Sequence, residues 1–242
     1  MKKKYVYSFF KRIFDIVYSL IAIILLLLPF IIISIAIKLD SKGPVFFKQD
    51  RVGKNKKLFK ILKFRSMYVD TDPNAPTHKL GNAKSHITKV GAFIRKTSLD
   101  ELPQLINIFI GQMSFVGPRP ALWNQYDLIE ERDKYFANNV VPGLTGLAQI
   151  SGRDELEIPV KAKYDGEYVQ KRGFFYDLAL IFRTAFCVFK HKGVVEGGTG
   201  ELEKQKEEGN NKWGKYWLLV LIPILVLLLK NILMKTFLKH IL

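Results

Sequence analysis

The chain has 242 residues, which is enough for one domain with a packed core together with membrane elements. Its formal net charge of +16 favours an anionic partner, such as a lipid headgroup, a phosphorylated substrate or a nucleic acid. The single cysteine, Cys187, excludes an internal disulfide. Because Cys187 lies in an apolar helical pattern, a packed thiol is favoured over a catalytic one.

Residues 16–37 contain no charged side chain. As a helix, this run of 22 residues would be about 33 Å long, close to the hydrocarbon thickness of a bilayer. The residues that follow, Lys38, Leu39 and Asp40, offer no small-residue cleavage site, so a secretory signal is not favoured. We therefore expect residues 1–40 to form an N-terminal membrane anchor.

Both flanks of this run are basic, which bears on how the run enters a membrane. Five lysines and arginines precede it, and ten basic residues stand against two acidic ones between Lys38 and Arg65. Since basic flanks mark the cytoplasmic side of a membrane segment, a straight span would place one basic flank outside. Pro29 lies within the run and would break or kink the helix there. We predict a re-entrant hairpin with both ends on the cytoplasmic face, with a straight span as the alternative.

The rest of the chain divides by composition into three parts. Residues 41–200 are predicted to form the cytoplasmic domain, a mostly helical α+β fold with a small strand element. Residues 201–215 are rich in charge and are typical of a linker. Residues 216–242 are apolar with lysines toward the end, and we expect either a second membrane anchor or an interfacial helix.

Hydrophobic periodicity and turn residues place the elements of the 41–200 domain. The helix that carries Asp100 begins near Ser98, because Pro103 is tolerated only in a first helical turn. In chain order, the expected elements are strands at 45–49 and 57–64 around a hairpin loop at 51–55, a loop at 70–86, that helix from about 98 to the turn at 117–118, a helical pattern over 123–139, and a turn-rich loop at 141–146.

The segment 174–190 carries phenylalanines at steps of three and four residues, which is the pattern of an amphipathic helix. Phe175, Phe182 and Phe186 belong to this stripe. Core packing is the ordinary explanation, whereas the basic composition of the chain favours binding at a membrane interface. Both explanations stay open at this point.

Asp100 and Glu101 are adjacent carboxylates at the expected start of the helix. One interpretation is structural: Ser98 and Glu101 have the spacing of a capping box, and acidic residues stabilise a first helical turn. The other interpretation is chemical. A helix N-terminus favours an approaching phosphate, an ionised aspartate can attack phosphorus to form an acyl phosphate, and its neighbour can help to hold a divalent metal.

Several cations are candidates for binding phosphate. Arg119 lies between Pro118 and Pro120, which restrict the backbone and fix the direction of a guanidinium suited to bidentate phosphate binding. Arg95 precedes Asp100 by five residues and would add a second contact. The same role, or a solvated role facing lipid headgroups, is open to three further residues: Lys60, Lys63 and Arg65.

Five motifs occur in an order that resembles the bacterial sugar transferases that initiate surface glycan assembly, the monotopic phosphoglycosyl transferases. The resemblance covers residues 9 to about 200, and its specificity lies in several long motifs that follow one another. They are KRIFD at 11–15, KILKFRSM at 60–67, SLDELPQL at 98–105, MSFVGPRP at 113–120 and PGLTGLAQ at 142–149.

The resemblance implies an enzyme that transfers a sugar 1-phosphate from a UDP-sugar to undecaprenyl phosphate, with UMP as the second product and Mg²⁺ as the cofactor. By similarity, Asp100 is the nucleophile that forms a covalent phosphosugar intermediate, Glu101 is its catalytic partner, and both carboxylates hold the metal. The expected substrate-binding residues are Arg95, Arg119, Lys63, Arg65, Pro118, Pro120, Gly143, Thr145 and Gly146.

The resemblance also implies a helix-rich domain with a small strand element at the cytoplasmic face of the bacterial inner membrane, a re-entrant first segment broken at a proline, and a homodimer in many members. Two positions depart from the family pattern. Leu28 stands before Pro29 where many relatives have serine, and Val141 stands before the Pro-Gly pair at 142–143 where many have a basic residue. The tail from Tyr216 onward lies outside the usual catalytic unit.

Two other classes of function are alternatives. A non-catalytic peripheral membrane-binding protein would use its basic surface on anionic lipids and would need no acidic dyad. A nucleic-acid binder would also suit a net charge of +16. The membrane segment and the lack of a recognisable nucleic-acid module argue against this second alternative, so no nucleic-acid partner is expected.

Overall fold

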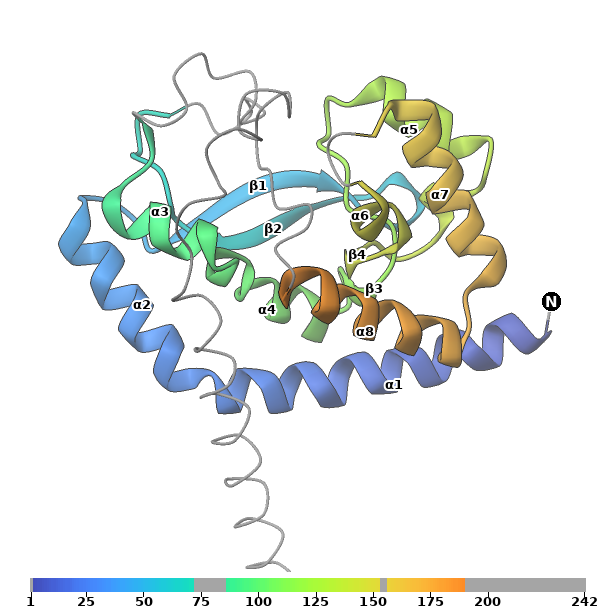
Figure 1. The fold of residues 1–242 in the computed structure, drawn as a ribbon, viewed down its shortest axis with the longest axis horizontal. Helices are drawn as coiled ribbons and strands as arrows, with labels where there is room; N and C mark the ends of the chain where they lie inside the picture. The colour runs from blue at the N-terminus through green and yellow to red at the C-terminus, as the bar shows by residue number, and fades with distance from the viewer. Residues whose placement is uncertain (1, 72–85, 153–155, 190–242) are drawn as a thin grey trace, which may run out of the picture. The chain divides into compact units, whose positions relative to one another are not determined.

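The computed structural model describes residues 2–71, 86–152 and 156–189. The predicted linker at 201–215, the apolar tail at 216–242 and most of the loop at 70–86 lie outside these residues. The helical pattern predicted at 123–139 divides into α5 and η5. In chain order (Figure 1), the elements are α1 (Lys2–Leu25), α2 (Leu27–Asp40), β1 (Phe46–Val52), η1 (Lys54–Lys56), β2 (Leu58–Phe64), α3 (Lys89–Lys96), η4 (Leu99–Glu101), α4 (Gln104–Phe109), β3 (Ser114–Val116), α5 (Tyr126–Asp133), η5 (Ala137–Asn139), β4 (Gly143–Thr145), α6 (Leu147–Ser151), α7 (Ile158–Lys171) and α8 (Phe174–Phe189).

The apolar segment folds as two helices, α1 and α2, which form a pair bent by 61°. The break falls at Leu26, three residues before Pro29, rather than at the proline as predicted. A proline ring clashes with the carbonyl four residues earlier, here that of Leu25, and has no N–H to donate to it. Pro29 therefore explains the bend, and its effect appears one turn toward the N-terminus.

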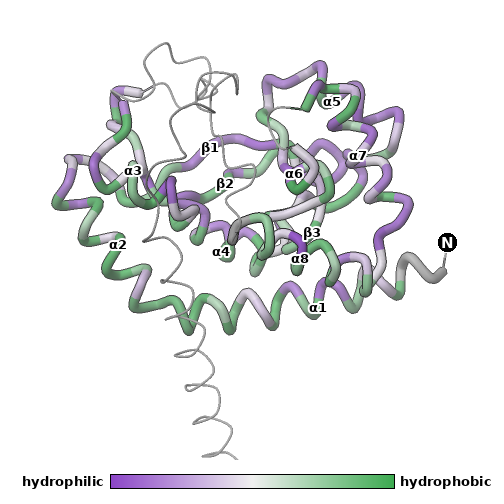
Figure 2. Tube along the Cα trace, viewed as in Figure 1, coloured by the Kyte–Doolittle hydropathy of each residue, from purple (hydrophilic) through white to green (hydrophobic). Residues whose placement is uncertain are grey.

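Among the described helices, none alone is both long and apolar enough to cross a membrane, whereas Val6–Leu25 and Leu27–Asp40 pass that test as a bent pair. Figure 2 shows the pair as a largely hydrophobic stretch. A large apolar face that no described residue covers is typical of a segment inserted in lipid. The exposed apolar side chains along the pair include Val17, Leu20, Ile21, Ile24, Leu27, Leu28, Ile31, Ile32 and Ile35.

Strands in the described residues form two small sheets of two strands each. β1 and β2 pair antiparallel over their full length, and β1 extends to Val52, three residues further than predicted. The turn between them is closed by Gly53, whose N–H donates to the Lys57 carbonyl at 2.8 Å. The second sheet pairs β3 with β4 in parallel, where the sequence predicted a turn-rich loop at 141–146.

The parallel pair brings two glycine backbones to contact distance. The Gly117 N–H donates to the Thr145 carbonyl at 2.8 Å, and the Gly143 N–H donates to the Pro118 carbonyl at 2.9 Å. A Cβ on Gly143 would lie only 2.0 Å from the Gly117 nitrogen. These glycines were predicted as turn formers, but their actual role is to permit the close approach of two segments that are distant in the sequence.

α4 ends at Phe109, well before the turn at 117–118 where the sequence predicted its end. Gly111 follows with a φ of 89°, the left-handed conformation that commonly terminates helices. Arg12 of α1 caps this end, because its guanidinium donates to the carbonyls of the last two residues of α4, each at 2.7 Å. The bent pair is thereby attached to α4.

α1 is also attached to β3. Asp15 accepts hydrogen bonds from the Ser114 hydroxyl and the Phe115 N–H, both at 3.1 Å. Between these two attachments lies a core that β2 and α4 form together. Its buried apolar residues are Phe59, Ile61, Leu105, Ile108 and Met113.

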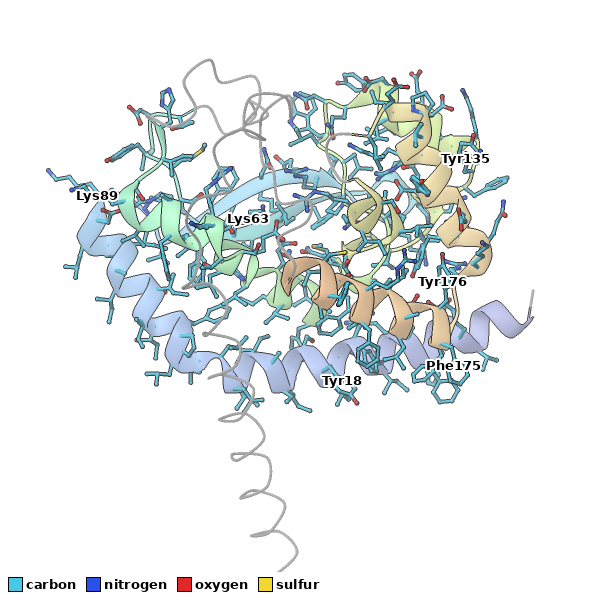
Figure 3. The ribbon with its side chains drawn as sticks, viewed as in Figure 1. Tyr18, Lys63, Lys89, Tyr135, Phe175 and Tyr176 are labelled. Atoms are coloured by element: carbon cyan, nitrogen blue, oxygen red, sulfur yellow. The ribbon has the colours of Figure 1, made fainter. Side chains whose placement is uncertain are left out.

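α8 turns its phenylalanines outward. Phe175, Phe182 and Phe186 are 81%, 67% and 59% exposed, whereas Leu180 on the same helix is 1% exposed. Figure 3 shows Phe175 on the outer side of the helix beside α1. Within the described residues, core packing therefore does not explain the phenylalanine stripe, and the exposed face is typical of an interfacial helix. The Cys187 thiol lies half-buried on the same helix.

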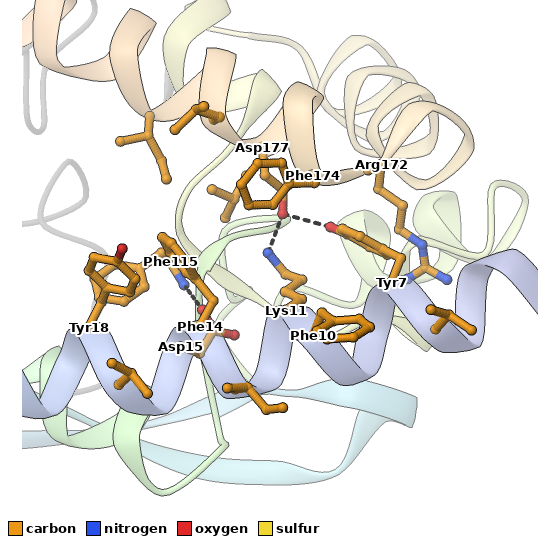
Figure 4. Close-up of a pocket in the computed structure, with 17 residues that line it drawn as sticks. Tyr7, Phe10, Lys11, Phe14, Asp15, Tyr18, Phe115, Arg172, Phe174 and Asp177 are labelled. Carbon is orange, nitrogen blue, oxygen red and sulfur yellow. Dashed lines mark hydrogen bonds and ion pairs between the residues drawn. The ribbon is translucent and has the colours of Figure 1, made fainter.

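A groove of about 800 Å³ lies between α1 and α8 (Figure 4). Its walls are mostly apolar, and its polar lining includes Tyr7, Lys11, Arg172 and Asp177. The Tyr7 hydroxyl donates to Asp177 Oδ2 at 2.6 Å, and Lys11 Nζ pairs with the same oxygen. These contacts join α1 to α8, and the predicted carboxylate dyad is not part of the groove lining.

Replacing Gly143 with alanine is expected to lower stability by about 1 to 3 kcal/mol, because the added methyl group overpacks the backbone contact with Gly117. Gly173→Ala is the matched control, since the nearest atom to its added Cβ is the Lys171 carbonyl oxygen at 3.9 Å. Thermal unfolding in detergent measures the difference, and 1 kcal/mol corresponds to about 2 to 4 °C in Tm for a chain of this size. Equal Tm values for the two variants would contradict the glycine contact.

Candidate active site

Asp100 and Glu101 lie in η4, a single 3-10 turn between α3 and α4. The chain enters this turn through Ser98, whose φ of 56° and ψ of 17° are left-handed. The Ser98 side chain makes no capping hydrogen bond, so the predicted capping box is wrong. Capping uses an extended backbone that aims the hydroxyl at the free N–H groups of the first turn, and a left-handed backbone does not do so.

Two cations lie beside the two carboxylates. Lys63 Nζ is 2.9 Å from Glu101 Oε1 and 3.8 Å from Asp100 Oδ2, and Arg119 Nη2 is 3.6 Å from Glu101 Oε1. We call Lys63, Asp100, Glu101 and Arg119 the dyad cluster. Asp100 is only 4% exposed, so these charges interact across less solvent than an ion pair on the surface does.

The four members of the dyad cluster come from three different local structures. Lys63 is the second-last residue of β2 (Figure 3), the carboxylates lie in η4, and Arg119 lies in the loop after β3. Lys63 precedes Glu101 in the chain and Arg119 follows it, and both cations contact the Glu101 carboxylate. The structure thus brings together three motifs that the sequence analysis identified separately.

Asn107 of α4 fixes the position of β2 relative to the dyad. Its side chain is completely buried, and its Oδ1 accepts from the Leu62 N–H at 2.9 Å. Its Nδ2 donates to the Lys60 carbonyl at 2.9 Å and to Gln112 Oε1 at 2.7 Å. Since Lys63 directly follows Leu62, these bonds hold its strand against the helix that begins just after the dyad.

Two of the cations proposed from the sequence lie elsewhere. Arg65 is buried, and its guanidinium donates to the carbonyls of Ser41 and Lys42, each at 2.7 Å, at the C-terminal end of α2. Lys60 is exposed and pairs with Asp50 on β1 at 3.0 Å. The contacts of Arg65 and Lys60 are therefore with the scaffold and not with the dyad cluster.

Arg95 lies half-buried in the last turn of α3. It precedes Ser98, the residue with the left-handed backbone, by three positions. Its backbone carbonyl accepts the Ser98 N–H at 3.1 Å, so Arg95 belongs to the junction that leads into η4. The predicted contact of Arg95 with substrate stays a prediction.

The glycines and the threonine of the 143–146 segment make structural contacts. Gly143 and Gly146 both pack against the Gly117 backbone. Thr145 Oγ1 is 2.6 Å from Thr184 Oγ1 on α8, and that hydroxyl donates to the Leu180 carbonyl, so Thr145 is the donor of the pair. The segment therefore supports the buried residues Pro118 and Pro120, which flank Arg119.

No group of three or more histidine, cysteine, aspartate or glutamate side chains suited to a metal ion occurs within residues 2–71, 86–152 and 156–189. The adjacent carboxylates of Asp100 and Glu101 nevertheless have the right chemistry for Mg²⁺. This ion usually binds one or two carboxylates and completes its octahedron with water and substrate phosphates. The dyad fits an ion that is bound together with a phosphorylated substrate.

Comparison with known proteins identifies the family of this chain. The family described as bacterial sugar transferase matches residues 6–191. This match spans the bent helix pair, the dyad cluster and α8, so the chain belongs to the bacterial sugar transferase family.

Curated relatives share 38–41% identity with the chain in several cases. The exopolysaccharide production protein ExoY of Rhizobium meliloti is 38% identical over 198 residues, which cover 76% of this chain and 87% of ExoY. The UDP-glucose:undecaprenyl-phosphate glucose-1-phosphate transferase of Escherichia coli is 40% identical over 192 residues, 76% of this chain and 41% of the relative. The undecaprenyl-phosphate galactose phosphotransferase of Salmonella typhimurium is 38% identical over 202 residues, 77% of this chain and 42% of the relative. The chain therefore spans most of ExoY and less than half of the two longer relatives.

A buried ion pair near the site was missed by the sequence analysis. Arg132 of α5 and Asp165 of α7 lie 2.6 Å apart and have side-chain exposures of 4% and 1%. Burial raises the pKa of the Asp165 carboxyl, and Arg132 opposes that rise. Charged residues on polar helices are normally solvated, and a partner on another helix leaves no local pattern, so the sequence carries no signal for this pair.

Replacing Arg65 with lysine is expected to lower stability by about 1 to 3 kcal/mol, because one ammonium group cannot replace a fork that reaches both Ser41 and Lys42. Lys60→Ala, on the strand β2 that ends just before Arg65, is the control, and loss of its exposed ion pair should cost less than about 1 kcal/mol. Thermal unfolding of the two variants in detergent provides the comparison. A Tm for Arg65→Lys equal to that of the unmodified protein would show that Arg65 does not hold the end of α2.

Proposed function

We propose that this chain transfers a sugar 1-phosphate from a UDP-sugar to undecaprenyl phosphate, forming an undecaprenyl-diphosphate-linked sugar and UMP. The observation that carries the proposal is the dyad cluster, in which buried Asp100 and its neighbour Glu101 lie beside Lys63 and Arg119. An aspartate flanked by cations is suited to attack an anionic phosphoryl group, because the cations offset the charge repulsion. The names of the Escherichia coli and Salmonella relatives describe this class of reaction with glucose and galactose.

The first step forms a covalent intermediate on Asp100. One oxygen of its carboxylate attacks the β-phosphorus, which bears the sugar, and a new phosphorus–oxygen bond forms. The bond between that phosphorus and the oxygen bridging to the α-phosphate breaks, and UMP leaves with this oxygen and its electron pair. In the second step, an oxygen of undecaprenyl phosphate attacks the same phosphorus, and the Asp100 carboxylate is released.

The other members of the dyad cluster bind and orient the donor. Arg119 contacts a donor phosphate through its planar guanidinium, and Lys63 supplies a second positive charge beside the transferred group. Glu101 holds both cations in place through the ion pairs described above. Arg95 adds a phosphate or nucleotide contact from the end of α3. Mg²⁺ would be held by Asp100 and Glu101, where it offsets the negative charge of the diphosphate.

The membrane placement follows from the apolar faces. We place the bent pair of α1 and α2 in the bilayer as a re-entrant hairpin, with the dyad cluster at the cytoplasmic face of the bacterial inner membrane. The exposed phenylalanines of α8 lie in the same interface and keep the site next to a lipid-linked acceptor. The product would begin a surface polysaccharide, as the name of ExoY suggests for that relative.

The covalent intermediate can be trapped. With UDP-sugar labelled in the sugar and the β-phosphate, and with no lipid acceptor, we expect stoichiometric label on the purified protein and release of UMP. Asp100→Asn should lose both, since an amide is not a phosphoryl nucleophile, with transfer reduced by at least about 10³-fold. UDP-glucose and UDP-galactose are tested in parallel, because relatives of both kinds match the chain.

Two outcomes of this experiment contradict the proposal in different ways. Turnover with lipid acceptor but no covalent label would mean direct transfer, with the dyad in another role. No UMP release with any UDP-sugar, together with tight binding to anionic vesicles that Asp100→Asn retains, would indicate the non-catalytic peripheral membrane protein.

The re-entrant hairpin predicts that both ends of the bent pair lie on one side of the membrane. In a Cys187→Ser background, Tyr5→Cys and Lys42→Cys should both resist a membrane-impermeant maleimide added to spheroplasts. Both should react after permeabilisation, because the basic flanks stay on the cytoplasmic side. Labelling of only one of the two positions from outside would mean that the pair crosses the bilayer as a bent span.

A further inference from the structure

In the loop that carries Arg119, each main-chain carbonyl from residue 118 to residue 121 accepts a hydrogen bond. The Pro118 carbonyl accepts from the Gly143 N–H at 2.9 Å, and the Ala121 carbonyl accepts from the Val52 N–H at 2.9 Å. These outer two bonds are main-chain bonds to β4 and to the end of β1. The inner two carbonyls, those of Arg119 and Pro120, accept from arginine side chains.

Arg132 holds the Arg119 carbonyl. Its Nη2 donates to that oxygen at 3.0 Å and also to Asp165 Oδ2 at 2.6 Å, while its Nε donates to the same carboxylate oxygen at 2.8 Å. Asp165 therefore fixes the plane of the guanidinium, and the guanidinium fixes the carbonyl. A buried ion pair adds little net stability in general, because desolvation of both charges opposes their attraction. The role of this pair is better explained by the carbonyl that it holds.

The next carbonyl is held in the same manner. Arg51 of β1 donates from Nη1 to the Pro120 carbonyl at 3.1 Å. Its Nε and Nη2 both donate to Gln49 Oε1, at 3.0 and 2.6 Å, so this guanidinium is also fixed by a second side chain. Two consecutive carbonyls of the loop are thus fixed from two different elements, α5 and β1.

This arrangement determines where the Arg119 side chain points. The rings of Pro118 and Pro120 fix the φ angles at both neighbours, and a following proline confines Arg119 to extended backbone conformations. Within this extended region, the φ and ψ angles of Arg119 itself can still vary. The bond from the Gly143 N–H holds the Pro118 carbonyl and so the peptide plane before Arg119, whereas rotation about ψ turns the Arg119 carbonyl. Since Arg132 holds that carbonyl, it also sets the direction in which the side chain of Arg119 leaves the backbone.

We propose that Arg132, held by Asp165, is a positioning residue that directs the Arg119 guanidinium toward Glu101 and the donor phosphate. This inference rests on the proposed function, because its test measures the release of UMP. It assigns the buried Arg132–Asp165 pair, which joins α5 to α7, to donor binding. Arg132 itself lies behind the loop, buried against Asp165, and does not contact the dyad carboxylates through any hydrogen bond or ion pair described here.

The test is a double-mutant cycle measured by UMP release with the UDP-sugar that the unmodified protein uses best. Arg132→Lys keeps a positive charge beside Asp165 but has no fork to reach Asp165 and the Arg119 carbonyl together. We expect it to lower kcat/KM about ten-fold, mainly through a higher KM for the donor. In the Arg119→Ala background, the same change should alter kcat/KM by less than about two-fold, because no guanidinium remains to be positioned.

Asn138→Ala controls for a loss of folding in this region. Asn138 is buried, and it donates to the Ile129 carbonyl at 2.7 Å and to Asp133 Oδ1 at 2.8 Å, but it makes no hydrogen bond to the Arg119 loop. At a matched decrease in Tm, Asn138→Ala should keep kcat/KM within about two-fold of the unmodified protein.

The outcomes separate the inference from the proposed function. An equal decrease for Arg132→Lys in both backgrounds, or an equal decrease for Asn138→Ala, would overturn the positioning role while leaving the reaction in place. Unchanged kinetics in Arg119→Ala would remove Arg119 from donor binding and overturn the positioning role with it. No UMP release by the unmodified protein would overturn the proposed function itself.

Discussion

The site depends most on the contact between α1, the first helix of the bent pair, and α4. Arg12 of α1 donates to the carbonyls of Ile108 and Phe109 at the end of α4. α4 has only six residues and follows directly on the turn that carries Asp100, so the position of α1 constrains the dyad. Asp15 adds a second attachment through β3, which leads into the Arg119 loop. α1 therefore supports both sides of the dyad cluster.

The parts of the site that the sequence predicted are those with local signals. Adjacent carboxylates identified Asp100 and Glu101, and flanking prolines identified Arg119. From residue type alone, Lys60 and Lys63 were equal candidates on one predicted strand, whereas the family resemblance implied Lys63. Side chains three apart on a strand face opposite sides, so the structure directs Lys63 to the dyad and Lys60 to Asp50. Which side faces the dyad depends on how the strand packs on α4.

The parts of the fold that were not predicted depend on contacts between distant segments. The β3–β4 pair forms because Gly117 and Gly143 permit a close backbone approach, and glycine alone indicates only a turn. The bend at Leu26 shows a related effect, since Pro29 acts on the preceding turn of the helix. Asn107 reads as a polar interruption of an apolar helix, yet its amide joins α4 to β2.

The basic composition has two meanings in this structure. A net charge of +16 suggested an anionic partner, but Arg12, Arg51, Arg65 and Arg132 all donate to main-chain carbonyls. Each carbonyl belongs to a helix end or a loop without a regular hydrogen-bond ladder, where a planar fork can reach two acceptors at once. Lysine offers no such fork, so these positions explain part of the arginine content without any ligand. In the proposed mechanism, the charge that faces a phosphorylated substrate lies in the dyad cluster and Arg95, whereas these four arginines bind main-chain carbonyls of the scaffold.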